Sequence, residues 1–180
     1  MKERPIYKGA HVNLSGNALS VGDLAPEVAL VKGDLSSVNI GGSRKNAQLI
    51  ICILSADTPV CATELKTFNA KCAAIEGVDA IAVSMDLPFA QNRFVSNEGI
   101  DRLILASDFR DRAFGRGYGA LIADGALASL LARAVFVVAP NGRIVYKEIV
   151  KDISDEPNYD AALSAVKEAV KPLANDENAA

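Results

Sequence analysis

The segment Leu49–Glu64 reads LIICILSADTPVCATE and joins an apolar run to a polar turn. The predicted strand at 47–53 is apolar at odd and even positions alike, which is typical of a strand buried on both faces between helices. A segment with helical periodicity follows the turn, so we expect Cys61 in the first turn of a helix. Unpaired N–H groups and the positive end of the helix dipole favour an anion there, and the thiolate is the nucleophilic form of cysteine. The segment therefore predicts a reactive thiol in the first turn of the helix that follows a buried strand.

Helical spacing continues beyond this cysteine and predicts a helix over 59–75. Its apolar positions lie four, three, four and three residues apart and form one stripe: Cys61, Leu65, Phe68, Cys72 and Ile75. The chain then alternates apolar runs with helical segments. We expect a strand at 78–84, a short helix from Pro88 through 95, a strand at 103–106 and a helical turn at 111–116.

The two ends of the chain predict hairpins. Asn141-Gly142 lies between apolar runs at 134–138 and 142–149, which is a strong antiparallel hairpin signal. Residues 4–20 are turn-rich and predict an N-terminal hairpin. We also expect a strand near 27–32, a closing helix over 158–171 and a frayed polar tail at 174–180.

The order of these elements predicts an α/β fold. We expect this fold to be a thioredoxin-like sandwich with a central mixed β-sheet, flanking helices and an N-terminal β-hairpin. The length of 180 residues suits a single domain spanning 1–180.

The composition argues against two classes of protein, nucleic-acid-binding proteins and membrane-spanning proteins. The net charge is −3 and Lys and Arg are scattered, which argues against a nucleic-acid partner. No apolar run approaches the roughly 18 residues of a membrane span. The polar start, residues 1–5, lacks the apolar core of a signal peptide, so we expect a cytoplasmic protein without a membrane partner.

The cysteines do not indicate a disulfide framework. There are three of them, with no Cys-x-x-Cys pair, and His11 is the one histidine in the chain. A zinc site or a Cys-His nucleophile pair would depend on that distant residue, so we expect no metal and no cofactor. A disulfide oxidoreductase also fits poorly without a Cys-x-x-Cys motif.

Several motifs match a known family in their order along nearly the whole chain. They are DTPVC at 57–61, DLPFAQNRF at 86–94, YG at 118–119 with IADG at 122–125, LARA at 131–134 and EPNYDAAL at 156–163. With these motifs the sequence resembles the bacterial thiol peroxidases, a branch of the peroxiredoxins.

The resemblance implies a function as well as a fold. It implies reduction of hydrogen peroxide and organic hydroperoxides, thioredoxin as the usual reductant, and a homodimer. It maps the peroxidatic cysteine to Cys61, its hydroxyl partner to Thr58 and the activating arginine to Arg133. The arginine would supply permanent positive charge, and the threonine hydroxyl would orient the peroxide.

Each assignment has a structural alternative. Cys61 could be a small core residue, Thr58 only a helix N-cap, and Arg133 a solvated charge at a strand edge. For Glu64 we favour stabilisation of the first helical turn over pairing with a cation near the site. We expect the Arg93-Phe94 pair to serve packing and the surface.

Two positions depart from the family pattern. The family's resolving cysteine is replaced by Val95, and Leu54 stands where peroxiredoxins usually carry proline. Cys72 lies eleven residues after Cys61, about 16 Å along a continuous helix, whereas a disulfide needs Cα atoms within about 7 Å. We expect Cys52 to be structural too, so the sequence predicts a one-cysteine peroxidase reduced by an external thiol.

The two departures also support an alternative. A catalytically degenerate or trapped-state peroxiredoxin could act as a redox sensor or binding protein, and the sequence leaves open whether the two replacements are natural or engineered. Composition does not identify a dimer interface, although apolar residues near Arg133 are candidates: Ile122, Leu127, Leu130 and Leu131.

Overall fold

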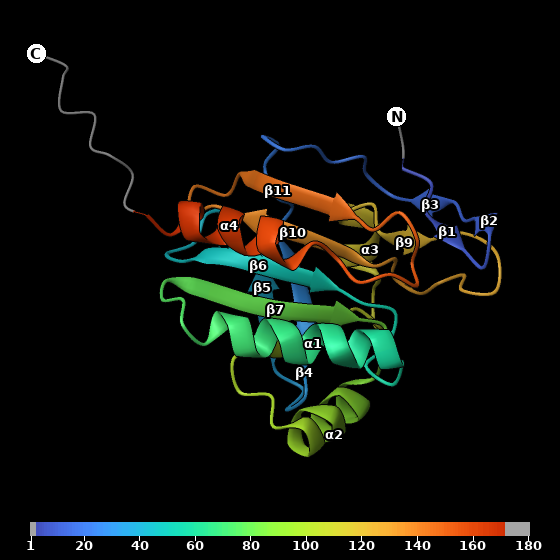
Figure 1. Ribbon diagram of the computed structural model, residues 1–180, viewed down its shortest axis with the longest axis horizontal. Helices are drawn as coiled ribbons and strands as arrows, with labels where there is room; N and C mark the ends of the chain where they lie inside the picture. Colours follow the sequence, from blue (N-terminus) through green and yellow to red (C-terminus); the bar gives the residue numbers. More distant parts are fainter. Residues whose placement is uncertain (1–2, 172–180) are drawn as a thin grey trace, which may run out of the picture.

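The computed structural model describes residues 3–171, which form a seven-stranded mixed sheet at the centre of the molecule (Figure 1). The strand order is β11-β10-β6-β7-β8-β4-β5. In that order, the bounds are Ile144–Ile149, Ala134–Val138, Ala47–Cys52, Val78–Ser84, Ile104–Ser107, Val28–Lys32 and Ser37–Ile40. Strands β6, β7 and β8 run parallel, and the remaining neighbours are antiparallel. The predicted mixed sheet is confirmed.

Helices cover both faces of this sheet. Helices α1 (Pro59–Cys72) and α4 (Tyr159–Ala169) pack on one face, where Leu49 and Ile51 of β6 point (Figure 1). The short helix α3 (Ala113–Gly117) packs on the other face, against alternate residues of β6. Every residue of β6 is buried, as the apolar run that begins at Leu49 predicts, and the polar Gln48 is buried with them. Helix α2 (Pro88–Glu98) lies beside β8 at the lower edge of Figure 1.

The N-terminal hairpin is shorter than the prediction over 4–20. Strand β1 (Ile6–Tyr7) pairs with β2 (Ala10–His11) through a tight turn in which Lys8 and Gly9 both have positive φ. Strand β3 (Leu14–Ser15) instead pairs with the distant β9 (Leu121–Ile122). The hairpin prediction is therefore right for the first part of this segment and wrong for the rest, since local turn signals do not reveal a long-range partner.

Most predicted elements occur, with shifted ends. The strands at 78–84 and 134–138 have the predicted bounds, while the helix predicted over 59–75 ends at Cys72. The helix after Pro88 runs past 95 to Glu98 and ends where Gly99 adopts a left-handed conformation, with φ +64°. Strand β5 had no counterpart in the prediction. The predicted tail at 174–180 lies outside the described residues.

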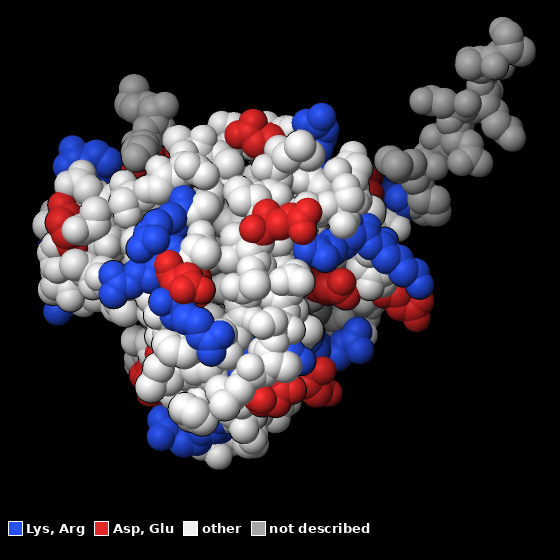
Figure 2. Space-filling view, turned by 180° about the vertical axis from the view of Figure 1, so that it is seen from behind, with Lys and Arg blue, Asp and Glu red and all other residues white. Residues whose placement is uncertain are grey.

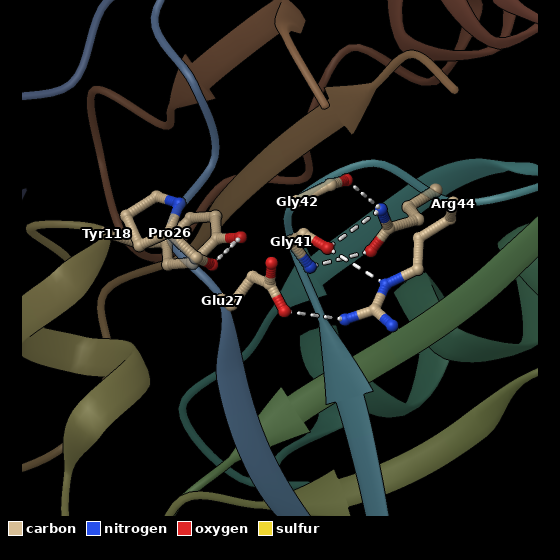
Figure 3. Close-up of polar contacts among 7 residues, drawn as sticks. Pro26, Glu27, Gly41, Gly42, Arg44 and Tyr118 are labelled. Atoms are coloured by element: carbon tan, nitrogen blue, oxygen red, sulfur yellow. Dashed lines mark hydrogen bonds and ion pairs between the residues drawn. The ribbon is translucent and has the colours of Figure 1, made fainter. Parts of the chain in front are cut away.

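A buried amide closes the turn between β5 and β6 (Figure 3). Gln48, near the start of β6, accepts a hydrogen bond from the Gly41 N–H at 2.7 Å and donates to the Gly41 and Gly42 carbonyls at 3.5 and 3.3 Å. Arg44 Nε donates to the same Gly41 carbonyl at 3.0 Å. Gly41 has φ +75°, and a Cβ there would lie 1.9 Å from the Pro26 carbonyl oxygen, so the turn requires glycine.

Charged side chains of both signs lie interspersed on the face opposite α1 and α4 (Figure 2). This distribution agrees with a net charge of only −3. Among the described residues, no helix combines the length and apolar character needed to cross a bilayer.

Candidate active site

The candidate nucleophile lies in the first turn of α1. Thr58 occupies the N-cap position, Pro59 begins the helix, and Cys61 is the third helical residue. Proline at the first helical position has no N–H group of its own to leave unpaired, and its backbone angle suits the helix. Cys61 is fully buried and is a free thiol. The predicted placement of a cysteine at a helix N-terminus is therefore confirmed.

Arg133 reaches this thiol from a strand far away in sequence. It immediately precedes β10, whose first residue, Ala134, pairs with Cys52 at the end of β6. The antiparallel pairing thus brings the start of β10 beside the connection from β6 to α1. Arg133 Nη1 lies 3.5 Å from Cys61 Sγ, and Nε donates to the Ile153 carbonyl at 3.0 Å. Arg133 is only 2% exposed, so the alternative of a solvated edge charge is wrong.

Glu64 shares the same guanidinium. It follows Cys61 by three residues, so both side chains lie on one face of α1. Its Oε2 accepts a hydrogen bond from Arg133 Nη1, and both residues of this ion pair are buried. The preferred interpretation of Glu64, stabilisation of the first helical turn alone, is wrong, because the carboxylate turns inward to a cation. Its other oxygen, Oε1, has no hydrogen-bond partner among the described residues.

Burial controls the electrostatics of this pair. Loss of solvent raises the pKa of Glu64 to about 7, although the attraction of Arg133 opposes the shift. Burial also acts to lower the pKa of Arg133, but Glu64 and Cys61 outweigh it, so that pKa is raised. The guanidinium therefore stays charged, whereas the carboxyl exchanges its proton near neutral pH.

Thr58 does not use its side chain as a helix cap. Its hydroxyl donates to the Ser55 carbonyl at 3.0 Å, and the helix N-terminus has no side-chain cap hydrogen bond. The alternative in which Thr58 is only an N-cap residue is therefore wrong for the side chain. With its proton directed at Ser55, the hydroxyl oxygen retains lone pairs that can accept a hydrogen bond.

Asp86 holds the loop before α1, a role that the sequence-based predictions did not include. Asp86 follows β7, and its carboxylate accepts hydrogen bonds from the Ser55 hydroxyl at 2.7 Å and the Ala56 N–H at 2.8 Å. Strands β6 and β7 are parallel and their carboxyl ends meet at one edge of the sheet, so polar residues after both strands lie together. That pattern was visible in the sequence and could have identified Asp86.

The remaining cysteines lie away from the Cys61 thiol. Cys52 is fully buried on β6 in the core between the sheet and α3, whereas Cys61 is part of the core beneath α1 and α4. Cys72 ends α1 and is 2% exposed. Burial raises the pKa of Cys72, and that of Cys52 still more. Both thiols are therefore disfavoured as nucleophiles.

The two departures from the family pattern are both apolar packing positions. Leu54 is buried, and Val95 on α2 is half-buried against the same core as Cys61. Phe94 is also buried, while Arg93 is exposed and lies 3.6 Å from Asp57 in an ion pair. The expected packing and surface roles of this Arg-Phe pair agree with these positions.

The assembled side chains suit nucleophilic chemistry by sulfur. A thiol at a helix N-terminus, a permanent cation beside it and a hydroxyl in the preceding turn can stabilise a thiolate and a developing negative charge on oxygen. Among residues 3–171, no three His, Cys, Asp or Glu side chains gather closely enough to hold a metal ion.

Comparisons with known proteins agree with this chemistry. The Redoxin family pattern matches residues 20–163. A thiol peroxidase of Aquifex aeolicus (strain VF5) is 48% identical over 163 residues, which cover 91% of this chain and 96% of the relative. A thiol peroxidase of Campylobacter jejuni is 51% identical over 152 residues, which cover 84% of this chain and 86% of the relative.

Two solved structures are also similar to this chain over nearly their whole length. The crystal structure of a peroxiredoxin-like protein from Aquifex aeolicus has a TM-score of 0.91 at 47% identity, covering 93% of this chain and 98% of that one. A thiol peroxidase from Chromobacterium violaceum has a TM-score of 0.83 at 20% identity, covering 93% and 97% of the two chains, and supports the fold alone.

Proposed function

The chain belongs to the Redoxin family and is a peroxiredoxin-type thiol peroxidase, and from this premise we propose that Cys61 is its peroxidatic residue. The observation that carries the proposal is the 3.5 Å separation between Arg133 Nη1 and Cys61 Sγ inside the protein. A buried guanidinium beside a buried sulfur stabilises the thiolate, because few water molecules screen the attraction.

The first chemical step oxidises the sulfur. The Cys61 thiolate attacks one oxygen of the hydroperoxide, an S–O bond forms and the O–O bond breaks. The leaving oxygen takes the electron pair and a proton and departs as water or an alcohol, while Cys61 becomes a sulfenic acid. We propose hydrogen peroxide and organic hydroperoxides as substrates.

Arg133 and Thr58 have different roles in this step. The guanidinium offers charge and N–H donors to the oxygen on which negative charge develops. The Thr58 hydroxyl oxygen accepts a hydrogen bond from the peroxide O–H, since its own proton is directed at Ser55. Cys61 has no exposed surface, so access of the peroxide to the sulfur requires a local movement of the protein.

We propose that an external thiol, with thioredoxin as the expected reductant, returns Cys61 to its reduced state. One thiol displaces water from the sulfenic acid to form a mixed disulfide, and a second thiol releases Cys61 as the other two sulfurs join. Three features support this one-cysteine cycle. The position of the family's resolving cysteine holds Val95, Cys52 lies in the core on the other side of the sheet, and Cys72 is at the far end of α1.

Turnover and product mapping test this cycle. We expect peroxide consumption with dithiothreitol or thioredoxin, its abolition in Cys61→Ser and its retention in the matched variant Cys72→Ser. After one equivalent of peroxide, mass spectrometry should find sulfenic acid on Cys61. An intramolecular disulfide from Cys61 to Cys52 or Cys72 as the main product would contradict the one-cysteine cycle.

A second candidate is a catalytically degenerate or trapped-state protein that senses peroxide or binds a partner. It is motivated by Leu54 and Val95, two replacements near the chemistry. Oxidation of Cys61 without turnover by either reductant would favour it over the peroxidase.

We further propose that residues 1–180 form one domain, that the protein is a cytoplasmic homodimer, and that neither a nucleic acid nor a membrane is its partner. Of the four suggested interface residues, Ile122 and Leu131 are buried within the chain itself, so they are core residues. Leu127 and Leu130 are half-buried and remain the candidates. Sedimentation of the protein and of a Leu127→Glu variant tests this interface.

A further inference from the structure

The turn after β7 is bonded to the loop that precedes Cys61. The Asp86 carboxylate accepts hydrogen bonds from the Ser55 hydroxyl at 2.7 Å, the Ala56 N–H at 2.8 Å and the Ser84 hydroxyl at 2.9 Å. One side chain thus satisfies a hydroxyl and a backbone donor of the connection between β6 and α1. Hydrogen bonds to a charged acceptor are stronger than those between neutral groups.

The same loop residue passes this constraint on to Thr58. The Ser55 carbonyl accepts hydrogen bonds from the Thr58 N–H at 3.1 Å and from the Thr58 hydroxyl at 3.0 Å. The Thr58 carbonyl in turn accepts from the Ala62 N–H at 2.9 Å in the first turn of α1. A continuous series of contacts therefore runs from Asp86 through Ser55 and Thr58 to the helix turn that contains Cys61.

The other side of Asp86 is attached to rigid elements. Its N–H donates to the Ser84 hydroxyl at 3.2 Å, and its carbonyl accepts from the Ser107 hydroxyl at the end of β8. Gln91 on α2 donates to the same Ser84 hydroxyl and to the Ala106 carbonyl, both at 3.0 Å. Two strands and a helix thus fix the Asp86 carboxylate before it contacts the loop.

We propose that Asp86 is a positioning residue for peroxide reduction, which holds the Thr58 hydroxyl in place relative to the Cys61 sulfur. The proposal rests on the roles proposed above for Cys61 and Thr58. Among its hydrogen bonds within residues 3–171, none goes to the sulfur or to Arg133, so Asp86 acts through Ser55. Alignment of reacting atoms is sensitive to small displacements, and a shift of about 1 Å can cost about 100-fold in rate.

Two reactions of the Cys61 sulfur distinguish a positioning role of Asp86 from an effect on stability alone. Oxidation by hydrogen peroxide requires the Thr58 hydroxyl to orient the substrate, whereas alkylation by iodoacetamide requires the thiolate and access but no peroxide alignment. Both second-order rate constants are measured on Cys61 by peptide mass spectrometry, at a temperature where the variants are folded. The ratio of the oxidation rate to the alkylation rate is the readout, since a merely structural role would not change it.

Asp86→Ala removes all the side-chain acceptors, and we expect its ratio to fall by about 5- to 10-fold, approaching the effect of removing the Thr58 hydroxyl itself. Asp86→Asn should recover most of the ratio, because the amide oxygen can accept from the Ala56 N–H while the amide nitrogen donates to the Ser55 hydroxyl. Ser55→Ala removes one contact and should lower the ratio at least threefold. Because Asp86→Ala and Ser55→Ala interrupt one series of contacts, the double variant should resemble Asp86→Ala alone.

Asp108 supplies the matched control. It is 3% exposed and accepts hydrogen bonds from the backbone N–H groups of Phe114 and Gly115 at 3.0 and 2.8 Å, so it anchors α3 rather than the loop. Asp108→Ala should lower the melting temperature and leave the ratio unchanged.

The outcomes distinguish this proposal from the proposed function. Failure of peroxide to oxidise wild-type Cys61 would overturn both. Normal wild-type oxidation with an unchanged ratio in Asp86→Ala, or an equal fall in Asp108→Ala, would overturn the positioning role alone. If Asp86→Ala does not fold, Ser55→Ala decides: a threefold or larger fall in its ratio supports the role, and an unchanged ratio overturns it.

Discussion

Buried polar groups lie at both ends of β6, and they differ in how completely their hydrogen bonds are satisfied. Near its start, Gln48 bonds through both amide atoms to the backbone of Gly41 and Gly42 (Figure 3). Beyond its end, Arg133 is shared between Glu64 and the Cys61 sulfur, and Glu64 Oε1 has no partner among the described residues. Native proteins satisfy nearly all buried polar groups, so an unpartnered one needs an explanation.

The difference separates a structural cluster from a reactive one. Every donor of the Gln48 amide has a backbone acceptor, so that cluster fixes the turn between β5 and β6. The Arg133 cluster contains the Glu64 carboxyl, whose pKa is about 7, and a cation 3.5 Å from the Cys61 sulfur. The following predictions test this contrast, from the largest expected effect to the smallest.

The largest effect is expected at Arg133. Arg133→Met removes the cation, and peroxide oxidation of Cys61 should slow by about 100- to 1000-fold, the usual result of losing one donor to a developing oxyanion. Stability should also fall by about 1–3 kcal/mol, because the buried Glu64 carboxyl loses its hydrogen-bond partner. Stopped-flow oxidation and chemical denaturation measure the two effects.

A second substitution separates the effect on the oxidation rate from the effect on stability. Arg133→Met combined with Glu64→Met should restore most of the lost stability but none of the rate, since no buried charge remains while the cation is still missing. Recovery of the rate in this double variant would contradict the role of Arg133.

The next effect is a pH dependence of stability. The folded-state pKa of Glu64 is about 7 against 4.5 for the unperturbed group, so folding favours its protonated form. Its contribution is fully present below pH 4.5 and is lost as the pH rises through about 7. Relative to Glu64→Gln, the wild-type free energy of unfolding should decline by up to about 3 kcal/mol over that range. Denaturation curves for the two proteins that run parallel with pH would rule out this titration.

At the other end of β6, the effect should be on stability alone. Gln48→Met keeps the volume but leaves the Gly41 N–H and the Gly42 carbonyl without their partner, while the Gly41 carbonyl keeps only Arg44, which should cost about 2 kcal/mol of unfolding free energy. The rate of Cys61 oxidation should stay within twofold of wild type. A rate loss in a folded Gln48→Met protein would show that the two ends of the strand are coupled.

The smallest effect is expected at Thr58. Thr58→Val preserves the shape and removes the hydroxyl, and we expect about a tenfold slower oxidation, equivalent to about 1.4 kcal/mol of barrier. Thr58→Ser keeps the hydroxyl and serves as the control, with a rate near wild type. Equal rates in the two variants would leave Thr58 with only its backbone position at the start of α1.

Local sequence determined much of this protein. The apolar run from Leu49 to Leu54 determined that β6 is buried on both faces, and helical spacing placed Cys61 at the start of α1, because both signals depend on neighbouring residues. The resemblance, rather than spacing, pointed to Arg133 and Thr58. The mixed sheet also followed from the order of strands, helices and the Asn-Gly turn.

Tertiary structure decided which distant groups meet. The position of β10 beside β6 buried Arg133 against Cys61 and turned Glu64 from a helix-surface residue into its ion-pair partner. Because β6 and β7 are parallel and end at the same edge of the sheet, Asp86 lies beside the loop before α1. Strand β3 pairs with the distant β9 and not with a strand next to it in the sequence. Periodicity reports which face of an element is buried, but only the pairing of strands sets the identity of the partner, because that choice depends on packing over the whole sheet.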